Sequence, residues 1–502
     1  MSSFTPAKTA FNRVFLIEGR ARPDHEPIFQ SCMRAGTAEQ SFGDIERIEC
    51  PDPTRYGEFE EIGYIQGAID RATSSLIGRY AADLASELLR LAQKRCAVDA
   101  QVHFGACTDP RRFNTFTKAV IMENVSLTNW SSDELGALSS DENAIINETV
   151  DLSIGQLYEA LPLEFARRAD DLLTNEAVDV VICDQQSCGS DCDDESSGCE
   201  KIYVLVGALS GSPGTPPDIV YTIDHGANWA IDEVTSLGAA ESANALACLG
   251  DYMVVVSNDS NSLEWKLLSL LNAGVGFNWT EVTTGFVANA EPNDIWSVGT
   301  YAFIVGDGGY VYGTSDPTAG VTVLDAGTAT NNVLAAVHAL DDQFAVAVGA
   351  SDTIIYTETR TSWQAATATG GGNGLLAVWI KSETEWFVGD DAGNIYYTLD
   401  KGQTWSESPA SGNVPGTASE IHDIQFATDS VGYACGNLAT VAKAWRTFDG
   451  GYSWVSLPEG IGAMPTARDF NALAACPDDV NFVVEVGEGA AADDGVIVFG
   501  QD

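Results

Sequence analysis

The sequence predicts a mainly β protein whose C-terminal 300 residues are built from repeats and whose N-terminal part is not. Three observations lead to this prediction. An eight-residue turn pattern, Thr-x-Asp-x-Gly-x-x-Trp, occurs three times after residue 220. An apolar strand that ends in a small residue recurs seven times, at intervals of 40 to 51 residues. Residues 1–165 lack both repeats but show alternating strand patterns and one amphipathic helical stretch.

The turn pattern has a clear physical basis. The Asp side chain accepts hydrogen bonds from backbone N–H groups in a tight turn, and the Gly accepts a positive φ. The Trp then anchors the following outer strand against the next sheet. The expected structural residues are Asp224, Gly226 and Trp229 in the first copy, Asp400, Gly402 and Trp405 in the second, and Asp449, Gly451 and Trp454 in the third.

The seven strand endings count the units independently of the turns. Each interval leaves room for four short strands, which predicts a C-terminal seven-bladed β-propeller. We expect the seven strands with these endings to be the inner strands of the blades. The last unit ends after a third strand, 495–500, so another segment must complete it. Residues 178–182 either supply that strand or form the first blade's inner strand. The endings are Gly207, Ser257, Gly306, Gly349, Gly389, Gly436 and Gly487.

The N-terminal part is predicted to be α+β, a barrel or sandwich with one main helix. The helix is expected over 73–95, because Leu76, Tyr80, Leu84, Leu88 and Leu91 fall on one stripe. Strands are expected at 14–17, 98–104, 118–129 and 144–154. The polar segment 166–177 is expected to be a linker. The predicted domains are therefore an assembly domain, 1–165, and a propeller, 178–502.

The charge of the chain argues against nucleic-acid binding through phosphates. The formal net charge is −47. Residues 201–502 contribute −29, from 37 acidic and 8 basic residues, and residues 1–200 contribute −18, from 35 acidic and 17 basic residues. The clusters of Lys and Arg that bind phosphates do not occur. We also expect no membrane span and no signal peptide, because no apolar run is long enough and Met1–Arg13 has no apolar core.

Four of the eleven cysteines are close together, at Cys183, Cys188, Cys192 and Cys199. Zinc sites usually take their ligands from Cys-x2-Cys pairs, and this spacing has none. We expect at least one disulfide among the four, because the loop between them is too polar to be ordered by burial and an oxidising medium would permit the bond. Zinc and unpaired thiols remain the alternatives.

The turn pattern resembles the Asp-box of the BNR and Ycf48-like propeller families. Sialidases are the enzymes most often associated with Asp-boxes, and they need three arginines around the central channel. The repeat region has only Arg360, Arg446 and Arg468, two of which lie at or beside turn signals. No metal-binding His pair, nucleophile elbow or phosphate-binding Gly loop occurs. We therefore expect no catalytic residue, cofactor or metal, and a sialidase-like glycosidase is the least favoured alternative.

Residues 10–165 resemble phage tail tube proteins in the order of their strands and helix. The resemblance is carried by Asp99–Cys107, Lys118–Thr128 and Asn147–Ser153. It implies a virion structural protein, made in the host cytoplasm and located in the tail, whose subunits form stacked rings, expected to be hexameric, and tubes. Viral DNA would pass through the lumen without specific binding. The propeller would face outward and contact a host glycan or protein. The alternatives are a capsid decoration or fibre protein and a cell-surface binding protein.

Overall fold

In the computed structural model the chain forms two compact units, residues 1–162 and 163–502. In the first unit the structure describes the backbone of ten strands and a few side chains. In the second it describes residues 163–168, 173, 175–183, 199–207, 217–237, 243–257, 262–271, 279–288, 290–408, 410–411, 419–438, 441–457, 469–477, 479–489 and 495–501.

The first unit is organised around one long strand, β8 (Phe116–Ser132). The first half of β8 pairs with β7 on one side and β10 on the other, and its second half pairs with β9. The sheet continues to β2 at one end and to β3 at the other, and β4 and β5 form a separate hairpin. The other strands are β1 (Arg13–Glu18), β2 (Phe29–Cys32), β3 (Ala35–Ser41), β4 (Arg47–Pro51), β5 (Phe59–Tyr64), β6 (Arg71–Arg79), β7 (Val98–Gly105), β9 (Asn147–Ile154) and β10 (Gln156–Ala160).

The predicted helix over 73–95 is wrong at its beginning. Residues 71–79 form β6, which pairs with β3 and β9. Thr73 and Ile77 are β-branched, and pairing on both sides outweighs the helical spacing of the leucines. Residues 80–95 lie outside the described residues. Strands β1, β7, β8 and β9 overlap the four strand segments predicted from the sequence.

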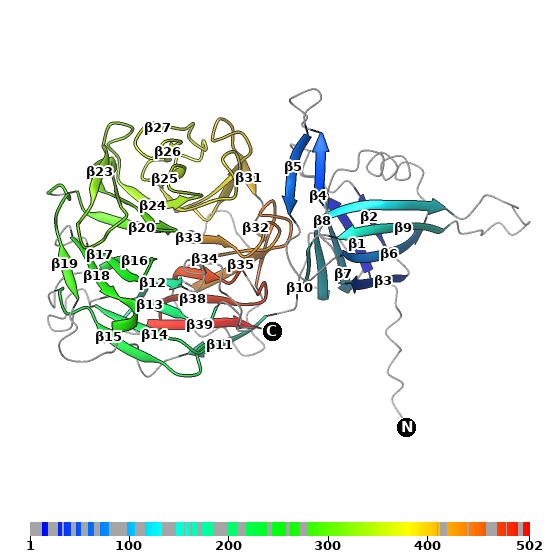
Figure 1. The fold of residues 1–502 in the computed structure, drawn as a ribbon, viewed down its shortest axis with the longest axis horizontal. Helices are drawn as coiled ribbons and strands as arrows, with labels where there is room; N and C mark the ends of the chain where they lie inside the picture. Colours follow the sequence, from blue (N-terminus) through cyan, green and yellow to red (C-terminus); the bar gives the residue numbers. More distant parts are fainter. Residues whose placement is uncertain are drawn as a thin grey trace, which may run out of the picture. The chain divides into compact units, whose positions relative to one another are not determined.

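The second unit is a seven-bladed β-propeller, in agreement with the count of seven repeats (Figure 1). Each blade is an antiparallel sheet of four strands. Blade 1 consists of β12 (Ala177–Ile182), β13 (Ile202–Val206), β14 (Asp218–Thr222) and β15 (Ala230–Glu233), and blade 2 of β16 (Ala243–Leu249), β17 (Tyr252–Ser257), β18 (Ser262–Leu267) and β19 (Thr280–Val282). Blade 3 consists of β20 (Pro292–Val298), β21 (Tyr301–Gly306), β22 (Tyr310–Thr314) and β23 (Thr322–Ala326), and blade 4 of β24 (Leu334–Ala339), β25 (Ala345–Gly349), β26 (Thr353–Thr357) and β27 (Trp363–Ala365).

The last three blades complete the ring. They are blade 5, β28 (Leu375–Ile380), β29 (Trp386–Asp390), β30 (Ile395–Thr398) and β31 (Ser406–Ser408); blade 6, β33 (Ser419–Phe426), β34 (Gly432–Leu438), β35 (Val441–Thr447) and β36 (Trp454–Ser456), with the short β32 (Ala410–Ser411) added outside; and blade 7, β37 (Asp469–Ala475), β38 (Val483–Glu488), β39 (Gly495–Gln501) and β11 (Glu164–Arg168). Among the described residues the helices are two 3-10 turns, η2 (Leu268–Leu270) and η3 (Asp307–Gly309), and none is long and apolar enough to cross a membrane.

Strand β11 closes the ring. It pairs with β39 over five residues, from Glu164 opposite Gln501 to Arg168 opposite Ile497, so the last blade takes its outer strand from the start of the unit (Figure 1). Of the two alternatives left open for residues 178–182, the structure selects the first blade's inner strand, β12. The segment expected to be a linker, 166–177, therefore contains part of β11, and the propeller begins at residue 163.

The strands with small-residue endings are not the inner strands of the blades, as we had expected, but the second ones. The second strand is covered by neighbouring blades on both faces, so β13, β21 and β25 are buried at every residue. The inner strand lines the centre of the ring, and its burial alternates, as in β12 and β20. A continuous apolar run thus marks the most enclosed strand of a propeller rather than the innermost one.

The small endings have a steric cause. A Cβ added to Gly306 would lie 2.1 Å from the carbonyl oxygen of Glu291, and one added to Gly349 would lie 2.0 Å from that of Val333. Both carbonyls come from the start of the inner strand in the same blade. Glycine is needed at these positions because the inner strand bulges there and brings its backbone close.

Candidate functional site: the central cavity

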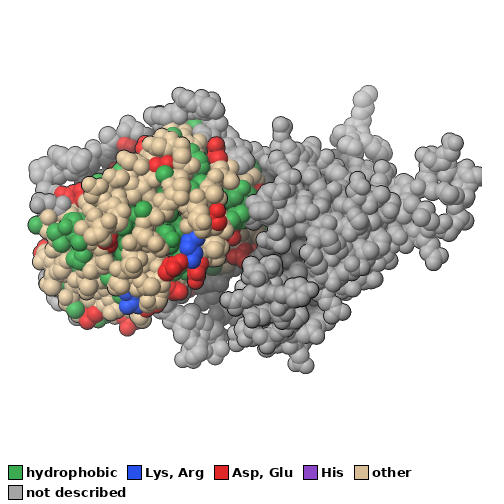
Figure 2. Space-filling model, turned by 90° about the horizontal axis from the view of Figure 1, so that it is seen from above, with side chains coloured by type: hydrophobic (Ala, Val, Ile, Leu, Met, Phe, Trp, Pro, Cys, Tyr) green, Lys and Arg blue, Asp and Glu red, His purple; other side chains and the backbone are tan. Residues whose placement is uncertain are grey.

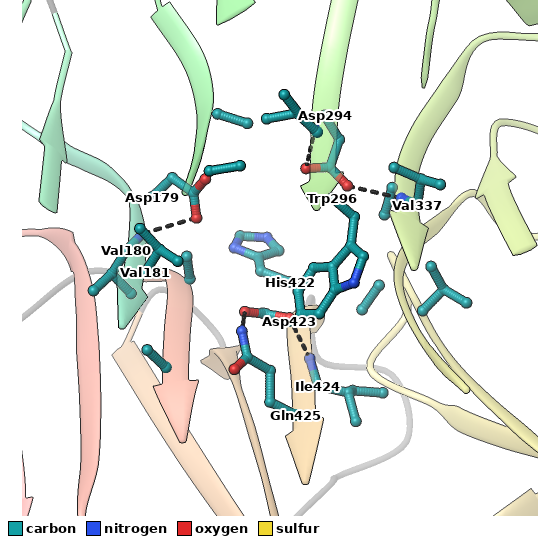
Figure 3. Close-up of a pocket in the computed structure, with 18 of the residues that line it drawn as sticks. Asp179, Val180, Val181, Asp294, Trp296, Val337, His422, Asp423, Ile424 and Gln425 are labelled. Atoms are coloured by element: carbon teal, nitrogen blue, oxygen red, sulfur yellow. Dashed lines mark hydrogen bonds between the residues drawn. The ribbon is translucent and has the colours of Figure 1, made fainter. Parts of the chain in front are cut away.

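The seven inner strands surround a cavity of about 560 Å³ at the centre of the ring (Figure 3). The strands contribute 178–182, 244–247, 293–297, 335–337, 376–379, 422–426, 471–472 and 474–475. Because every blade contributes to the wall, the cavity exists only when the ring is closed.

Each inner strand carries a β-bulge at the same place. The pairing register shifts at one residue in every blade, and the residue after the bulge is Asp179, Ala245, Asp294, Ala336, Ala377, Asp423 or Ala472 in blades 1 to 7. The seven equivalent positions thus hold aspartate in blades 1, 3 and 6 and alanine in the other four. Bulges re-aim side chains, and here they place three carboxylates on three sides of the cavity (Figure 3).

Each of the three carboxylates joins its blade to the next one. One oxygen of Asp179 accepts the N–H of Val180, at 2.8 Å, and the other accepts the N–H of Leu246 in blade 2, at 2.8 Å. Asp294 binds Ile295 and, across to blade 4, Val337. Asp423 binds Ile424 and, across to blade 7, Leu473. These bonds hold each carboxylate in a fixed orientation, and the Oδ2 atom of Asp423 also accepts a hydrogen bond from Gln425.

The cavity raises the pKa of all three carboxyl groups. Burial is the main cause, and it raises the pKa of Asp294 to about 7 and that of Asp423 to about 6. Burial also raises the pKa of Asp179 well above its ordinary value, and repulsion from Asp294 and Asp423 adds to the effect. The backbone hydrogen bonds act in the opposite direction. The three groups therefore share one electrostatic environment.

Aromatic side chains form the cavity wall in blades 3 and 5. Trp296 and Trp379 both line the cavity, and their ring centroids are 5.6 Å apart. His338 lies against both rings, with its centroid 4.4 Å from Trp296 and 4.1 Å from Trp379. Burial lowers the pKa of His338 to about 3, so this imidazole is neutral at pH 7. Trp296 and Trp379 each lie two residues after the aspartate or alanine that follows the bulge. At this position blades 1, 2 and 7 have the smaller Val181, Ala247 and Ala474.

A polar group adjoins the cavity at His422. Its Nε2 lies 2.8 Å from Glu420, and its Nδ1 lies 3.0 Å from the carbonyl oxygen of Phe470 and 3.4 Å from Asp469. Asn437 donates to both Glu420 and Asp469. Glu420, His422 and Asp469 are close enough to hold a metal ion, but the imidazole and the Asn437 amide already contact both carboxylates.

The three turns predicted from the sequence lie away from the cavity, between the third and fourth strands of blades 1, 5 and 6. In blade 5, Thr398 donates to Asp400 and accepts the N–H of Gly402, and Asp400 accepts the N–H of Thr404 at 2.8 Å. Gly402 has φ of +70°. The turn built on Thr222, Asp224 and Gly226 and the one built on Thr447, Asp449 and Gly451 repeat this pattern.

The tryptophans of these turns pack toward the preceding blade. Trp229 lies 5.8 Å from Phe499 of blade 7, centroid to centroid, and Trp405 donates to the carbonyl oxygen of Thr367, which follows blade 4. Trp454 is almost fully buried in the core between blades 5 and 6. The nine turn residues therefore stabilise blade packing and do not form part of the candidate site.

The cysteine cluster forms long-range disulfides. Cys183 is bonded to Cys248, which joins blades 1 and 2, and Cys199 is bonded to Cys476, which joins blades 1 and 7. Our expectation of a bond within the cluster is therefore wrong for Cys183 and Cys199. Cys188 and Cys192 lie outside the described residues. The partners were not predictable, because sequence spacing carries no information on contacts 65 and 277 residues apart.

The arginines expected at turn signals lie outside the cavity. Arg360 forms an ion pair with Asp342, and Arg446 is buried between blades 6 and 7, where it donates to the carbonyl oxygen of Val480. Arg468 lies outside the described residues. Among the described residues that line the cavity there is no Lys or Arg.

Comparisons with known proteins give the fold of the second unit and nothing narrower. No family model and no curated protein matches the chain. Several solved structures are similar to the second unit at low sequence identity. They share the fold alone. They include YCF48 bound to D1 peptide (13% identity, 68% of this chain and 96% of that one, TM-score 0.49), YCF48 from Cyanidioschyzon merolae (14%, 67% and 99%, 0.49) and virginiamycin B lyase from Staphylococcus aureus (10%, 68% and 100%, 0.50).

Proposed function

We propose that the protein is a non-enzymatic structural subunit of a particle, in which residues 1–162 assemble with other copies and the propeller is displayed as a binding module. In its finer form the proposal is a tail tube subunit: stacked rings around a channel through which DNA passes, with the propeller on the outside. A capsid decoration or fibre protein and a cell-surface binding protein are the alternatives that the experiment below separates from it.

One difference between the two units carries this proposal. The propeller leaves only short outer edges, because the outermost strands of its blades are two to five residues long and its last blade is completed by β11. In the sheet of the first unit, the described strands β2, β3 and β10 each pair with a single neighbour. Edge strands offer unpaired N–H and C=O groups to other chains, and pairing between copies is one way to satisfy them. Assembly through the first unit and display of the second follow from this difference.

The acidic surface of the propeller supports a position on the outside of the particle, where the propeller does not contact the phosphates of the DNA. On the face shown in Figure 2, acidic groups are scattered over the described surface and basic ones are few. Several basic side chains of the propeller already have acidic partners, such as Lys266 with Asp232 and Lys401 with Glu358. A surface of this kind repels DNA and keeps a displayed domain soluble.

Electron microscopy of the purified full-length protein tests the proposal. We expect rings or hollow tubes that carry discs of propeller size on their outer surface. A preparation that contains only dispersed monomers at all concentrations would contradict assembly. Copies that bind singly to an added capsid or cell surface would favour the decoration or surface-protein alternative instead.

A further inference from the structure

We propose that the central cavity of the propeller binds an organic cation, a guanidinium or ammonium group, between its three aspartates and its tryptophan wall. The inference rests on the proposed role of the propeller as the binding module and names the chemistry of its ligand. The group could belong to a small molecule or to a basic side chain of a polypeptide, and the experiment below separates these sources.

The charge of the cavity is the first argument. Asp179, Asp294 and Asp423 face one shared cavity, and the described lining contains His422 but no Lys or Arg to balance them. Close to the cavity, Glu420 and Asp469 add negative charge around His422, which contacts both. Carboxylates held by fixed backbone bonds cannot turn away from one another, so a cation between them relieves both repulsion and the loss of solvation.

The aromatic wall is the second argument, and it is independent of the carboxylates. Trp296 and Trp379 are only partly buried although each is on an inner strand, so part of each ring faces the cavity. The neutral His338 packed against both rings limits their movement. Tryptophan is the side chain whose ring face attracts cations most strongly. An anionic ligand would meet carboxylates here, and a purely apolar ligand would leave them without a partner.

The shape of the cavity is the third argument. The wall opposite the tryptophans is built from Val181, Ala247 and Ala474, so open space remains beside the aromatic rings. A cavity of about 560 Å³ admits a planar guanidinium with its alkyl stem. Gln425 points its amide toward this region (Figure 3), where its Nε2 donates to Asp423 at 3.2 Å and to the carbonyl oxygen of Leu473 at 2.6 Å.

Titration calorimetry of the full-length protein with a matched ligand pair tests the inference. The probes are N-acetyl-arginine amide and N-acetyl-citrulline amide, which have nearly the same shape and differ in charge. We expect the arginine compound to bind at least about tenfold more tightly, the ratio expected for a desolvated charge contact. A Gly/Ser peptide with one central arginine is the second arm. Tighter binding of the peptide than of the small compound assigns the site to a polypeptide, and equal binding assigns it to a free cation. Equal binding of the arginine and citrulline compounds, or binding of neither, would overturn the inference.

Two pairs of variants place the ligand in the cavity. Gln425→Lys puts an ammonium group beside Asp423 and should reduce arginine-amide binding about tenfold, whereas Gln343→Lys, which adds the same charge at an exposed residue between β24 and β25, should change it by less than about threefold. Trp379→Leu should reduce binding about fivefold, and Trp405→Leu, at the outer turn of blade 5, should not. A thermal melt of each variant checks that it folds. The comparison of the arginine and citrulline compounds uses the unmodified protein and therefore does not depend on the folding of any variant. Unchanged binding in both Gln425→Lys and Trp379→Leu would contradict this location.

The affinity should also depend on pH in one direction. A cation binds the ionised carboxylates, and burial raises the pKa of Asp423 to about 6 and that of Asp294 to about 7. The pKa of Asp179 is raised in the same direction. Binding of the arginine compound should therefore strengthen as the pH rises from 5 to 8, and it should release protons wherever these carboxyl groups are still protonated before binding. If the full-length protein assembles but shows no charge selectivity, only this inference fails. If it binds the cation but stays monomeric, the assembly proposal fails.

Discussion

Replacing Cys199 and Cys476 together by alanine is expected to lower the free energy of unfolding of the propeller by about 2–5 kcal/mol, the usual range for a native disulfide. This bond joins blade 1 to blade 7 across 277 residues of sequence. It therefore restrains the opening of the ring at the place where the two ends of the propeller meet. Guanidinium unfolding followed by tryptophan fluorescence measures the effect. A reducing agent added to the unmodified protein should destabilise it at least as much, because it also breaks the Cys183–Cys248 bond.

The second disulfide provides a matched control. Cys183 and Cys248 are 65 residues apart and join blades 1 and 2, which are also connected by the chain itself. In the chain-entropy model, the disulfide that closes this smaller loop stabilises the folded state by about 1 kcal/mol less than the Cys199–Cys476 bond. The Cys183→Ala, Cys248→Ala double variant should therefore be the milder of the two. Cys435→Ala, which removes a buried thiol without a disulfide, controls for lost packing. Equal stability of the unmodified protein with and without reductant would contradict a structural role for either bond.

Deleting β11 is expected to have a comparably large effect. A propeller that begins at residue 169 exposes the outer edge of β39, along which β11 makes five residue pairs. At about 0.5–1.5 kcal/mol for each of about five backbone hydrogen bonds, the loss amounts to about 2.5–7.5 kcal/mol. The exposed edge should also promote pairing between molecules. Light scattering and thermal unfolding of residues 169–502, compared with residues 163–502, measure both effects.

Rescue in trans gives this deletion a strict control. A synthetic peptide of residues 161–172, added to the shortened propeller, should restore its thermal stability and suppress association. A peptide of the same composition in scrambled order should not. If residues 169–502 are as stable and as monomeric as residues 163–502, β11 does not close the ring.

The sequence was sufficient for the number of blades because the features that report it are local. The turn at Thr398–Trp405 is formed by hydrogen bonds within eight residues, and the ending at Gly349 reflects a contact inside one blade. The order of strands within a blade was not predictable in this way, since burial of a strand depends on the neighbouring blades.

The central cavity could not be predicted from the sequence, because the residues that line it are brought together by strand register and by contacts between distant parts of the chain. Asp179, Asp294 and Asp423 are ordinary acidic residues in the sequence, and only the seven bulges place them in equivalent positions. An alignment of the seven inner strands, made after the second strands had been recognised, would have shown three Asp among four Ala. The end of β11, residues 166–168, was predicted to be part of a linker for a similar reason: the segment 166–177 is polar in composition, and the partner of β11 is more than 300 residues away.

The division of labour between the two units is tested most directly by the mass of each in solution. Residues 1–162 and 163–502, cut where the structure divides them, are produced separately and measured by multi-angle light scattering over a range of concentrations. The account predicts that the first fragment forms rings or larger assemblies and that the second stays monomeric. A propeller fragment that forms the rings while residues 1–162 remain monomeric would contradict it.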